Sequence, residues 1–227
     1  MRAPRKLKAE LDVELDFVFI HGWGMDGQIF NRLSRSLKAE APKTIELGFI
    51  KGGKTNWNYP ARPAIYITHS LGTLWLLREW RLRGVPSLGA LISLNGFSCF
   101  TEFTDPRQLK LMQRGLAKNP AAQMSDFWRR AGGGFHRDAG GLNAERLSEG
   151  LTWLAEWDET KTLASLKCPV LALGSAMDAI VPVENFKATW QDHNTAIHET
   201  ASHMLPLEAP EWCRDEILKF LKTSELV

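Results

Sequence analysis

Short apolar runs recur along the chain, and their residues are apolar in succession instead of alternating with polar ones. Five runs are clear and a sixth is weaker, and they cover residues 17–20, 44–47, 64–68, 88–94, 169–173 and 195–199. Continuous runs of this length are typical of strands that are buried on both faces. Helix-like stretches separate several of them, at 25–40, 72–83 and 183–192. This alternation predicts an α/β fold with a mostly parallel sheet, right-handed crossovers and flanking helices.

The alternation stops between about residue 96 and residue 160. This stretch has no convincing strand, and its helix-like segments lie at 106–118, 121–131 and 143–157. Three adjacent glycines, residues 132–134, interrupt it, and we interpret them as a flexible joint. We predict that residues 97–160 form a helical lid over the carboxyl edge of the sheet, where open α/β folds bind ligands. Residues 1–96 and 161–227 then form the core.

Composition and charge limit the classes of protein that fit this pattern. With 44% hydrophobic and 24% charged residues among 227, the chain can bury a core. A net charge of +2 does not favour a nucleic-acid partner, and no apolar run approaches the roughly 20 residues that span a membrane. The cysteines Cys99, Cys168 and Cys213 are odd in number and lack metal-ligand spacing. We expect a reduced, soluble, cytoplasmic protein with no metal, no nucleic-acid partner and no membrane partner.

The segment 64–72 joins an apolar strand to a helix-forming stretch through Ser70. In hydrolases with a nucleophile elbow, the serine lies on such a sharp strand-to-helix turn, within the pattern G-x-S-x-G. Here Leu71 and Gly72 follow the serine, and Thr68 stands where the first glycine is usual. The alternative is a strand that ends in a serine without catalytic function.

An elbow serine needs a general base and a group that orients the base. In this arrangement the chain order is serine, acid, histidine, and the last two follow later strands. Asp178 follows the run at 169–173, and His203 follows the run at 195–199. The order and the positions predict a triad of Ser70, Asp178 and His203.

Backbone N–H groups must stabilise the negative charge that develops on the substrate carbonyl oxygen. We expect one from Leu71, which follows the nucleophile, and one from Trp23, in the glycine-rich loop 21–24 after the first run. We expect His21 to shape this loop. Strand alternation points His69 away from the nucleophile, so we expect it to have a packing role.

Several stretches carry a resemblance to a known superfamily. They are His21-Gly22-Trp23-Gly24, Ser70-Leu71-Gly72, Ser98-Cys99-Phe100, Leu173-Gly174 with Asp178 and Val181-Pro182, Ala201-Ser202-His203, and Trp212-Cys213. The chain resembles the α/β-hydrolase superfamily over nearly its whole length. Within it, the chain most resembles the pimeloyl-[acyl-carrier protein] methyl ester carboxylesterases of biotin synthesis. The resemblance implies a serine hydrolase without a cofactor that cleaves the methyl ester of a carrier-bound acyl chain.

The resemblance also implies roles for individual residues. Ser70 is the nucleophile, His203 the general base and Asp178 the group that orients it, with Trp23 and Leu71 as oxyanion donors. The implied substrate-binding residues, several of them in the lid stretch 127–131, are Trp23, Phe100, Phe127, Trp128, Arg129, Arg130 and Met204.

Four basic residues recur along the predicted helix 106–118. At roughly 100° per residue they fall within about 80° of one another, and they are Arg107, Lys110, Arg114 and Lys118. Leu109, Met112 and Leu116 lie nearly opposite. An acidic acyl carrier protein would be attracted to such a face. A solvated helix face explains the same pattern, but the position within the predicted lid makes docking of a carrier protein a hypothesis to test.

Residues 48–55 match the phosphate-loop pattern G-x-x-x-x-G-K-[ST] letter for letter. That loop needs a helix to begin at its Lys-Thr, so that the helix N-terminus binds phosphate. Pro60 and Pro63 follow closely and disfavour such a helix. Three alternatives to a carboxylesterase stay open: a thioesterase or broad-range esterase, a ligand-binding protein of the same fold without catalysis, and a nucleotide-binding protein.

Overall fold

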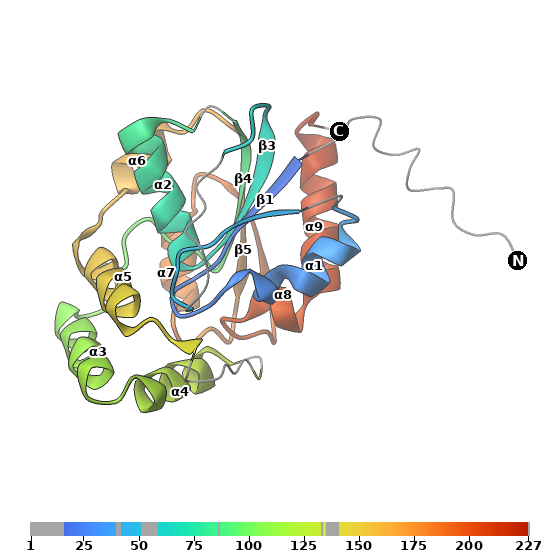
Figure 1. Cartoon of the computed structure of the whole chain (residues 1–227). Helices are drawn as coiled ribbons and strands as arrows, with labels where there is room; N and C mark the ends of the chain where they lie inside the picture. The colour runs from blue at the N-terminus through green and yellow to red at the C-terminus, as the bar shows by residue number, and fades with distance from the viewer. Residues whose placement is uncertain are drawn as a thin grey trace, which may run out of the picture.

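A six-stranded sheet forms the centre of the protein (Figure 1). The computed structural model describes residues 16–39, 42–50, 59–85, 87–132, 134 and 141–226. All neighbouring strands pair in parallel, in the order β2-β1-β3-β4-β5-β6. The strands are β1 (Asp16–Ile20), β2 (Lys43–Ile45), β3 (Ala64–His69), β4 (Leu88–Leu94), β5 (Val170–Ser175) and β6 (Asn194–His198). Each predicted apolar run overlaps one of these strands, so the predicted fold class is confirmed.

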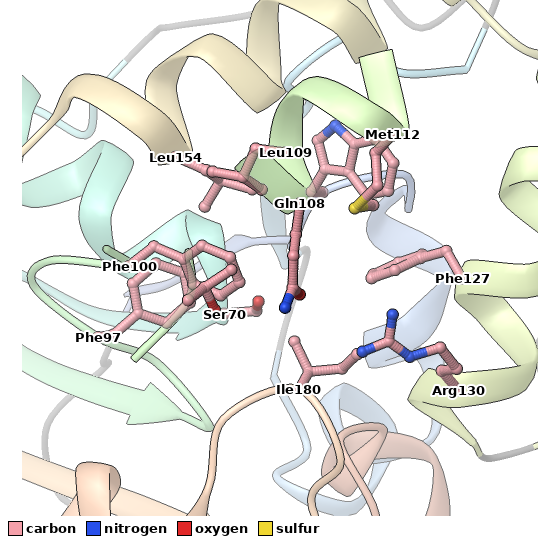
Figure 2. A pocket seen from close by; sticks show the side chains of 12 residues that line it. Ser70, Phe97, Phe100, Gln108, Leu109, Met112, Phe127, Arg130, Leu154 and Ile180 are labelled. Atoms are coloured by element: carbon pink, nitrogen blue, oxygen red, sulfur yellow. The ribbon is translucent and has the colours of Figure 1, made fainter. Parts of the chain in front are cut away.

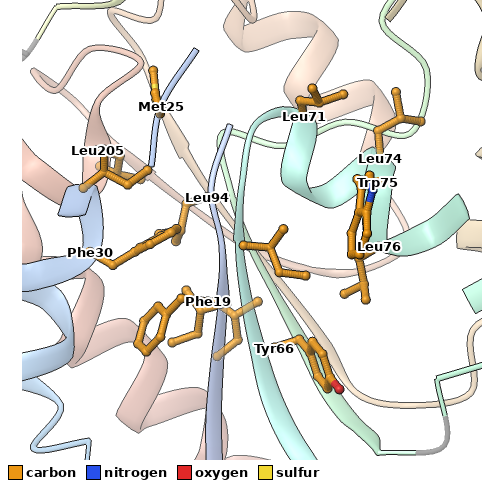
Figure 3. Close-up of a cluster of buried hydrophobic side chains, with 14 of the residues drawn as sticks. Phe19, Met25, Phe30, Tyr66, Leu71, Leu74, Trp75, Leu76, Leu94 and Leu205 are labelled. Carbon is orange, nitrogen blue, oxygen red and sulfur yellow. The ribbon is translucent and has the colours of Figure 1, made fainter. Parts of the chain in front are cut away.

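Helices cover both faces of the sheet (Figure 1), which is why the four central strands are mostly buried, whereas the edge strands β2 and β6 keep exposed residues. One face carries α2 (Leu71–Arg83), α6 (Thr160–Ser165) and α7 (Val183–Thr189), and the other carries α1 (Asn31–Ser36), α8 (Leu205–Glu208) and α9 (Pro210–Thr223). Phe19 and Phe30 pack on one side of the strands, whereas Leu74 and Trp75 pack on the other (Figure 3). All four side chains are buried, so the sheet lies between two apolar layers.

The helix predicted at 25–40 is wrong in its length. Residues Gly27–Phe30 form a 3₁₀ turn, and α1 occupies only the next six residues. The side chain of Asp26 accepts a hydrogen bond from the backbone N–H of Gln28 and starts the 3₁₀ turn there. The chain leaves the helix at Lys38, whose φ of 52° lies in the left-handed region.

Three helices of the predicted lid gather at one end of the sheet (Figure 1). They are α3 (Pro106–Lys118), α4 (Pro120–Ala131) and α5 (Ala144–Glu156), each within one residue of its predicted bounds. Asp105, Asn119 and Asn143 cap the three helices through side-chain oxygens that accept backbone N–H groups. Gly132, with a φ of 85°, follows the end of α4, while Gly133 of the predicted joint lies outside the described residues.

The two ends of the helical stretch lie side by side. Cys99 and Asp158 form an antiparallel bridge, and the backbone N–H of Glu159 donates to the carbonyl oxygen of Ser98, at 2.9 Å. The helices α3, α4 and α5 therefore leave the core and return to it at one place.

The matched phosphate-loop pattern lies mostly in residues 51–58, outside the described part of the chain. Residues 59–63, which come next, are not helical. Among the helices that the structure describes, none is both long enough and apolar enough to cross a bilayer.

Candidate active site

Ser70 lies at the junction between β3 and α2 in a strained backbone conformation, with φ 53° and ψ −125°. Its backbone N–H donates to the carbonyl oxygen of Leu94, at 3.0 Å, so the turn is held against β4. A Cβ atom on Gly72 would lie 2.4 Å from the carbonyl oxygen of Ile20. Only glycine therefore lets α2 start this close to the end of β1, as a nucleophile elbow requires.

Thr68, in the position where the elbow usually has its first glycine, supports the turn through its hydroxyl. Thr68 Oγ1 and Thr73 Oγ1 are 2.7 Å apart, and Thr73 Oγ1 and Ser93 Oγ are 2.9 Å apart. All three hydroxyls are buried. This chain of hydrogen bonds joins β3, α2 and β4 directly beneath Ser70.

Asp178 and His203 meet at the carboxyl ends of β5 and β6. His203 Nδ1 is 2.7 Å from Asp178 Oδ2, and the side chains are 0% and 1% exposed. The other carboxylate oxygen, Oδ1, accepts the backbone N–H groups of Ile180 and Val181, at 2.7 and 2.9 Å. The carboxylate is thus fixed by two backbone donors and orients the imidazole, as the acid of a serine-hydrolase triad does.

The other ring nitrogen of His203, Nε2, is buried and has no hydrogen-bond partner among the residues that the structure describes. A buried polar atom left unpaired costs roughly 1–3 kcal/mol. In a general base, this nitrogen takes the proton of the nucleophile, and such hydrogen bonds often tighten only when substrate is bound. His203 therefore presents an available acceptor on the side opposite Asp178.

His69 lies closer to the site than its predicted packing role suggested. Its Nε2–H donates to the carbonyl oxygen of His203, at 2.8 Å, and the two ring centroids are 4.8 Å apart. Burial, together with His203, holds the pKa of His69 well below its ordinary value. His69 is therefore a neutral imidazole against the candidate general base.

The loop after β1 lies against the nucleophile. A Cβ atom on Gly22 would be 3.0 Å from Ser70 Cβ and 2.8 Å from His69 Nδ1, so the backbone approaches both closely. His21 Nδ1 is 2.9 Å from the carbonyl oxygen of Gly22, and His21 Nε2 accepts the backbone N–H of Leu47, at 3.0 Å. These contacts confirm that His21 shapes the loop.

The two predicted oxyanion donors are Leu71, the sequence neighbour of Ser70, and Trp23, in the loop after β1 that approaches Ser70 at Gly22. Leu71 is the first residue of α2, where a backbone N–H has no acceptor within the helix. Trp23 follows Gly22 in the loop, and its indole N–H donates to the carbonyl oxygen of Leu147, at 2.8 Å. The indole is thereby fixed between the loop and α5, while the role of the two backbone N–H groups stays a prediction.

Asn95 is a supporting residue that the sequence reasoning missed. It ends β4 with a φ of 48°, and its side-chain amide donates to the carbonyl oxygen of His203 and to Ser175 Oγ, both at 3.0 Å. An Asn-Gly pair after a strand is the signal that could have drawn attention to it. Asn95 joins the end of β4 to the loop that carries His203.

Ser70 lines a cavity whose walls come in part from α3, α4 and α5 (Figure 2). The lining is mostly apolar and aromatic, and consists of Trp23, Ser70, Phe97, Phe100, Thr104, Gln108, Leu109, Met112, Phe127, Arg130, Leu154 and Ile180. Four of the predicted substrate-binding residues are among them, namely Trp23, Phe100, Phe127 and Arg130. Apolar walls with few polar groups are typical of small-molecule sites.

The structure gives the other three predicted substrate-binding residues different positions. Trp128 is buried away from the cavity lining, and its indole N–H donates to the carbonyl oxygen of Gly24, at 3.0 Å. The side chain of Arg129 is 74% exposed and pairs with Asp126, at 2.7 Å. Met204 is fully buried in the core. On α4, turns of 3.6 residues place Phe127 and Arg130 on the cavity side, and a run of five neighbours cannot all face it.

The basic stripe lies on the exposed side of α3. Its four residues are all exposed, and they are Arg107, Lys110, Arg114 and Lys118. Leu109 and Leu116 are buried and Met112 is half-buried, which confirms the predicted apolar side. Leu109 and Met112 also line the cavity, so α3 separates the candidate site from a cationic surface.

Within the described ranges, no group of three or more His, Cys, Asp or Glu side chains is arranged to hold a metal ion.

Comparison with solved structures identifies the fold. An esterase from Exiguobacterium antarcticum matches over 92% of each chain, with a TM-score of 0.76 and 13% identity. A bromoperoxidase from Bacillus anthracis matches over the same shares, with a TM-score of 0.76 and 18% identity. A thermophilic esterase from Thermogutta terrifontis matches over 92% of this chain and 90% of its own, with a TM-score of 0.73 and 16% identity.

No protein-family model matches the sequence, and no curated protein sequence is similar enough to count as a match. The structural matches show that the chain has the α/β-hydrolase fold. The narrower resemblance to the pimeloyl-[acyl-carrier protein] methyl ester carboxylesterases stays a prediction.

Proposed function

We propose that the protein is a serine carboxylesterase, with Ser70 as nucleophile, His203 as general base and Asp178 as the acid that orients it. The observation that carries this proposal is the 2.7 Å contact between His203 Nδ1 and Asp178 Oδ2, and the strained elbow conformation of Ser70 supports it. The esterases among the structural matches support the same reaction class.

In the proposed reaction, Ser70 Oγ attacks the ester carbonyl carbon, and its proton passes to His203 Nε2. The negative charge on the carbonyl oxygen meets the backbone N–H groups of Leu71 and Trp23. The bond to the alcohol oxygen then breaks, and the alcohol leaves with the proton from His203. Water, deprotonated by His203, attacks the acyl-enzyme, and the carboxylic acid leaves as Ser70 regains its proton.

The substrate that we propose is the methyl ester of an acyl chain, carried by an acyl carrier protein in biotin synthesis. The apolar lining of the cavity fits the acyl chain, and the exposed cations of α3 fit an acidic carrier. The resemblance noted in the sequence supports this choice over other esters.

The substitution Ser70→Ala tests the function. We expect kcat/KM for p-nitrophenyl esters to fall by about 10⁴-fold or more, and covalent labelling by a fluorophosphonate probe to be lost. Circular dichroism and the thermal midpoint check that the fold is intact. The matched control is Ser125→Ala, an exposed serine on α4, which should keep wild-type turnover and labelling. Turnover retained in Ser70→Ala, or a wild-type protein that neither labels nor hydrolyses, would refute the assignment.

A further inference from the structure

The helix α4 carries a stripe of buried residues along one side. They recur at the spacing of three and four residues that places side chains on one helix face, and they are Met124, Phe127, Trp128 and Ala131. The stripe contacts two loops that lie far apart in the sequence, the loop 21–24 after β1 and the loop 199–204 after β6. Each of these loops carries part of the candidate catalytic machinery.

The loop after β1 supplies Trp23, a predicted oxyanion donor. The indole N–H of Trp128 donates to the carbonyl oxygen of Gly24, at 3.0 Å. The rings of Trp23 and Phe127 meet edge to face, with their centroids 4.7 Å apart and their planes at 81°. Gly24 has a φ of 68°, and a Cβ atom there would lie 2.3 Å from Met124 Cε. Three residues of the stripe therefore hold this loop.

The loop after β6 carries His203, the candidate general base. Ser202 precedes it, and Ser202 Oγ lies 2.9 Å from the carbonyl oxygen of Ala131. The same hydroxyl is 2.6 Å from Glu208 Oε1, so its one proton can be donated to either acceptor. A Cβ atom on Gly132 would lie 2.2 Å from Ser202 Oγ. The backbone at the end of α4 therefore packs directly on the residue next to the general base.

The sheet does not connect these two loops directly, because β3, β4 and β5 lie between β1 and β6. The last turn of α4 does connect them, since Trp128 holds one loop and Ala131 the other. This turn is closed by the backbone N–H of Gly132, which donates to the carbonyl oxygen of Trp128, at 3.0 Å. A helical turn of about 5 Å therefore separates the two points of attachment.

We propose that the last turn of α4 sets the position of the oxyanion loop relative to His203, with Trp128 and Ser202 as positioning residues. This inference rests on the proposed esterase function and adds the helical stretch to its catalytic scaffold. Release of either attachment leaves the cavity able to bind substrate, but it loosens the oxyanion donor relative to the imidazole. The rate of the chemical steps then falls, because a misplacement of about 1 Å can cost about 100-fold.

The substitution Trp128→Phe keeps an aromatic ring and removes the indole N–H. We expect kcat for p-nitrophenyl acetate to fall by about tenfold, with KM within about twofold of the wild-type value. A trifluoromethyl ketone forms an adduct with Ser70 that carries the negative charge of the transition state. Its inhibition constant should therefore rise by the same factor by which kcat/KM falls.

The matched control is Trp190→Phe, which removes another buried indole N–H. That group donates to the carbonyl oxygen of Gly96, also at 3.0 Å. We expect the control to lower the thermal midpoint to a similar extent as Trp128→Phe, because each variant loses one buried hydrogen bond. The control should keep the wild-type kcat and the wild-type inhibition constant, which a purely structural role of Trp128 would not predict.

Ser202→Ala releases the other attachment of the turn. Its control is Ser36→Ala, which removes a half-buried hydroxyl that donates to the carbonyl oxygen of Leu33, at 2.8 Å. We expect Ser202→Ala to lower kcat by about threefold or more, and Ser36→Ala to leave it unchanged. When Trp128→Phe and Ser202→Ala are combined, kcat should stay within about twofold of the more impaired single variant. A turn released on one side no longer holds the two loops together, so the second release adds little.

Wild-type kcat and inhibition constant in Trp128→Phe would overturn the proposal, and so would an equal loss in Trp190→Phe. Single effects that multiply in the double variant would show two independent contacts and would also overturn it. If Trp128→Phe does not fold, the comparison of Ser202→Ala with Ser36→Ala decides, and equal kcat values would refute the proposal. All these outcomes leave the esterase function standing. A wild type that neither hydrolyses esters nor labels with the fluorophosphonate probe would refute that function and this inference together.

Discussion

Two buried side chains hold the backbone of the candidate general base. The imidazole of His69 and the amide of Asn95 both donate to the carbonyl oxygen of His203, at 2.8 and 3.0 Å. Asp178 holds the ring itself through Nδ1. The backbone and the ring of His203 are therefore both fixed by hydrogen bonds. His69 makes this donation as a neutral imidazole, because burial disfavours its charged form.

The neutral state of His69 predicts a pH dependence of folding stability. Burial lowers the pKa of His69 in the folded protein well below the ordinary value of 6.5 that it regains on unfolding. Below pH 6.5 the unfolded state therefore binds a proton that the folded state does not, and stability falls as the pH falls. The expected loss is up to about 1.4 kcal/mol per pH unit.

Urea unfolding between pH 5 and pH 8 measures this effect as a difference between wild type and His69→Gln. The free energy of unfolding of the wild type should decline relative to the variant as the pH falls below 6.5. His69→Asn, a second neutral replacement, should give the same difference. Parallel profiles for wild type and both variants would contradict a neutral buried His69.

At the scale of secondary-structure elements, Glu159 joins α2 to the start of α6. Its carboxylate is fully buried and accepts hydrogen bonds from Arg81 Nε, at 2.8 Å, and from Arg78 Nη1, at 3.2 Å. Burial alone would raise the pKa of Glu159, but hydrogen bonds from Arg81, Thr162 and Arg78 lower it below its ordinary value. The carboxylate is thus charged and fully paired, at the place where the chain returns from the lid to the core.

Removal of this carboxylate should destabilise the protein much more than removal of an exposed one. Loss of one partner of a buried ion pair costs about 3–5 kcal/mol. Because both arginines are partly exposed, we expect Glu159→Ala to cost about 2–3 kcal/mol. Glu184→Ala removes an equal charge from a pair with Lys187 whose side chains are 77% and 52% exposed, and should cost less than about 0.5 kcal/mol. Equal changes in the free energy of unfolding would show that Glu159 does not stabilise the junction.

At the scale of the whole molecule, α3 separates two environments. Its buried side lines an apolar cavity, and its outer side carries the four exposed cations. A carrier protein that docks on α3 would therefore lie next to the site that accepts its acyl chain. Such an attraction acts mainly on the rate of association and weakens with salt.

The double substitution Arg107→Glu and Arg114→Glu tests this docking. We expect KM for a carrier-bound ester to rise by at least about tenfold relative to KM for a small soluble ester, with a smaller difference at high salt. The control pair Arg35→Glu and Lys219→Glu changes the net charge by the same amount. These two residues lie on α1 and α9, on the face of the sheet opposite α2 and away from α3 (Figure 1). The control should keep the wild-type ratio of KM values. A ratio that does not change with the α3 substitutions would refute docking at this surface.

Much of the fold could be predicted because its signals are local. A strand covered on both faces is mostly apolar, so the runs at β1, β3, β4 and β5 each indicated a strand. The helix-like segments at 106–118 and 121–131 match α3 and α4 to within one residue, and in the structure a proline and a capping side chain stand at the start of each helix. The prediction of one helix at 25–40 was wrong because the 3₁₀ turn capped by Asp26 and the left-handed conformation of Lys38 interrupt a pattern that is otherwise typical of a helix.

The sequence by itself determined the chemistry that is available, since Ser70, Asp178 and His203 follow strands in the order that one chemical mechanism uses. Only the tertiary structure decided which neighbours surround them. It placed His69 and Asn95 against the backbone of His203, turned Arg130 into the cavity and Arg129 out of it, and linked Thr68 to Thr73 and Ser93. Whether a segment forms a strand or a helix follows largely from local periodicity, whereas these contacts join residues far apart in the chain, and their partners are set by the packing of whole elements.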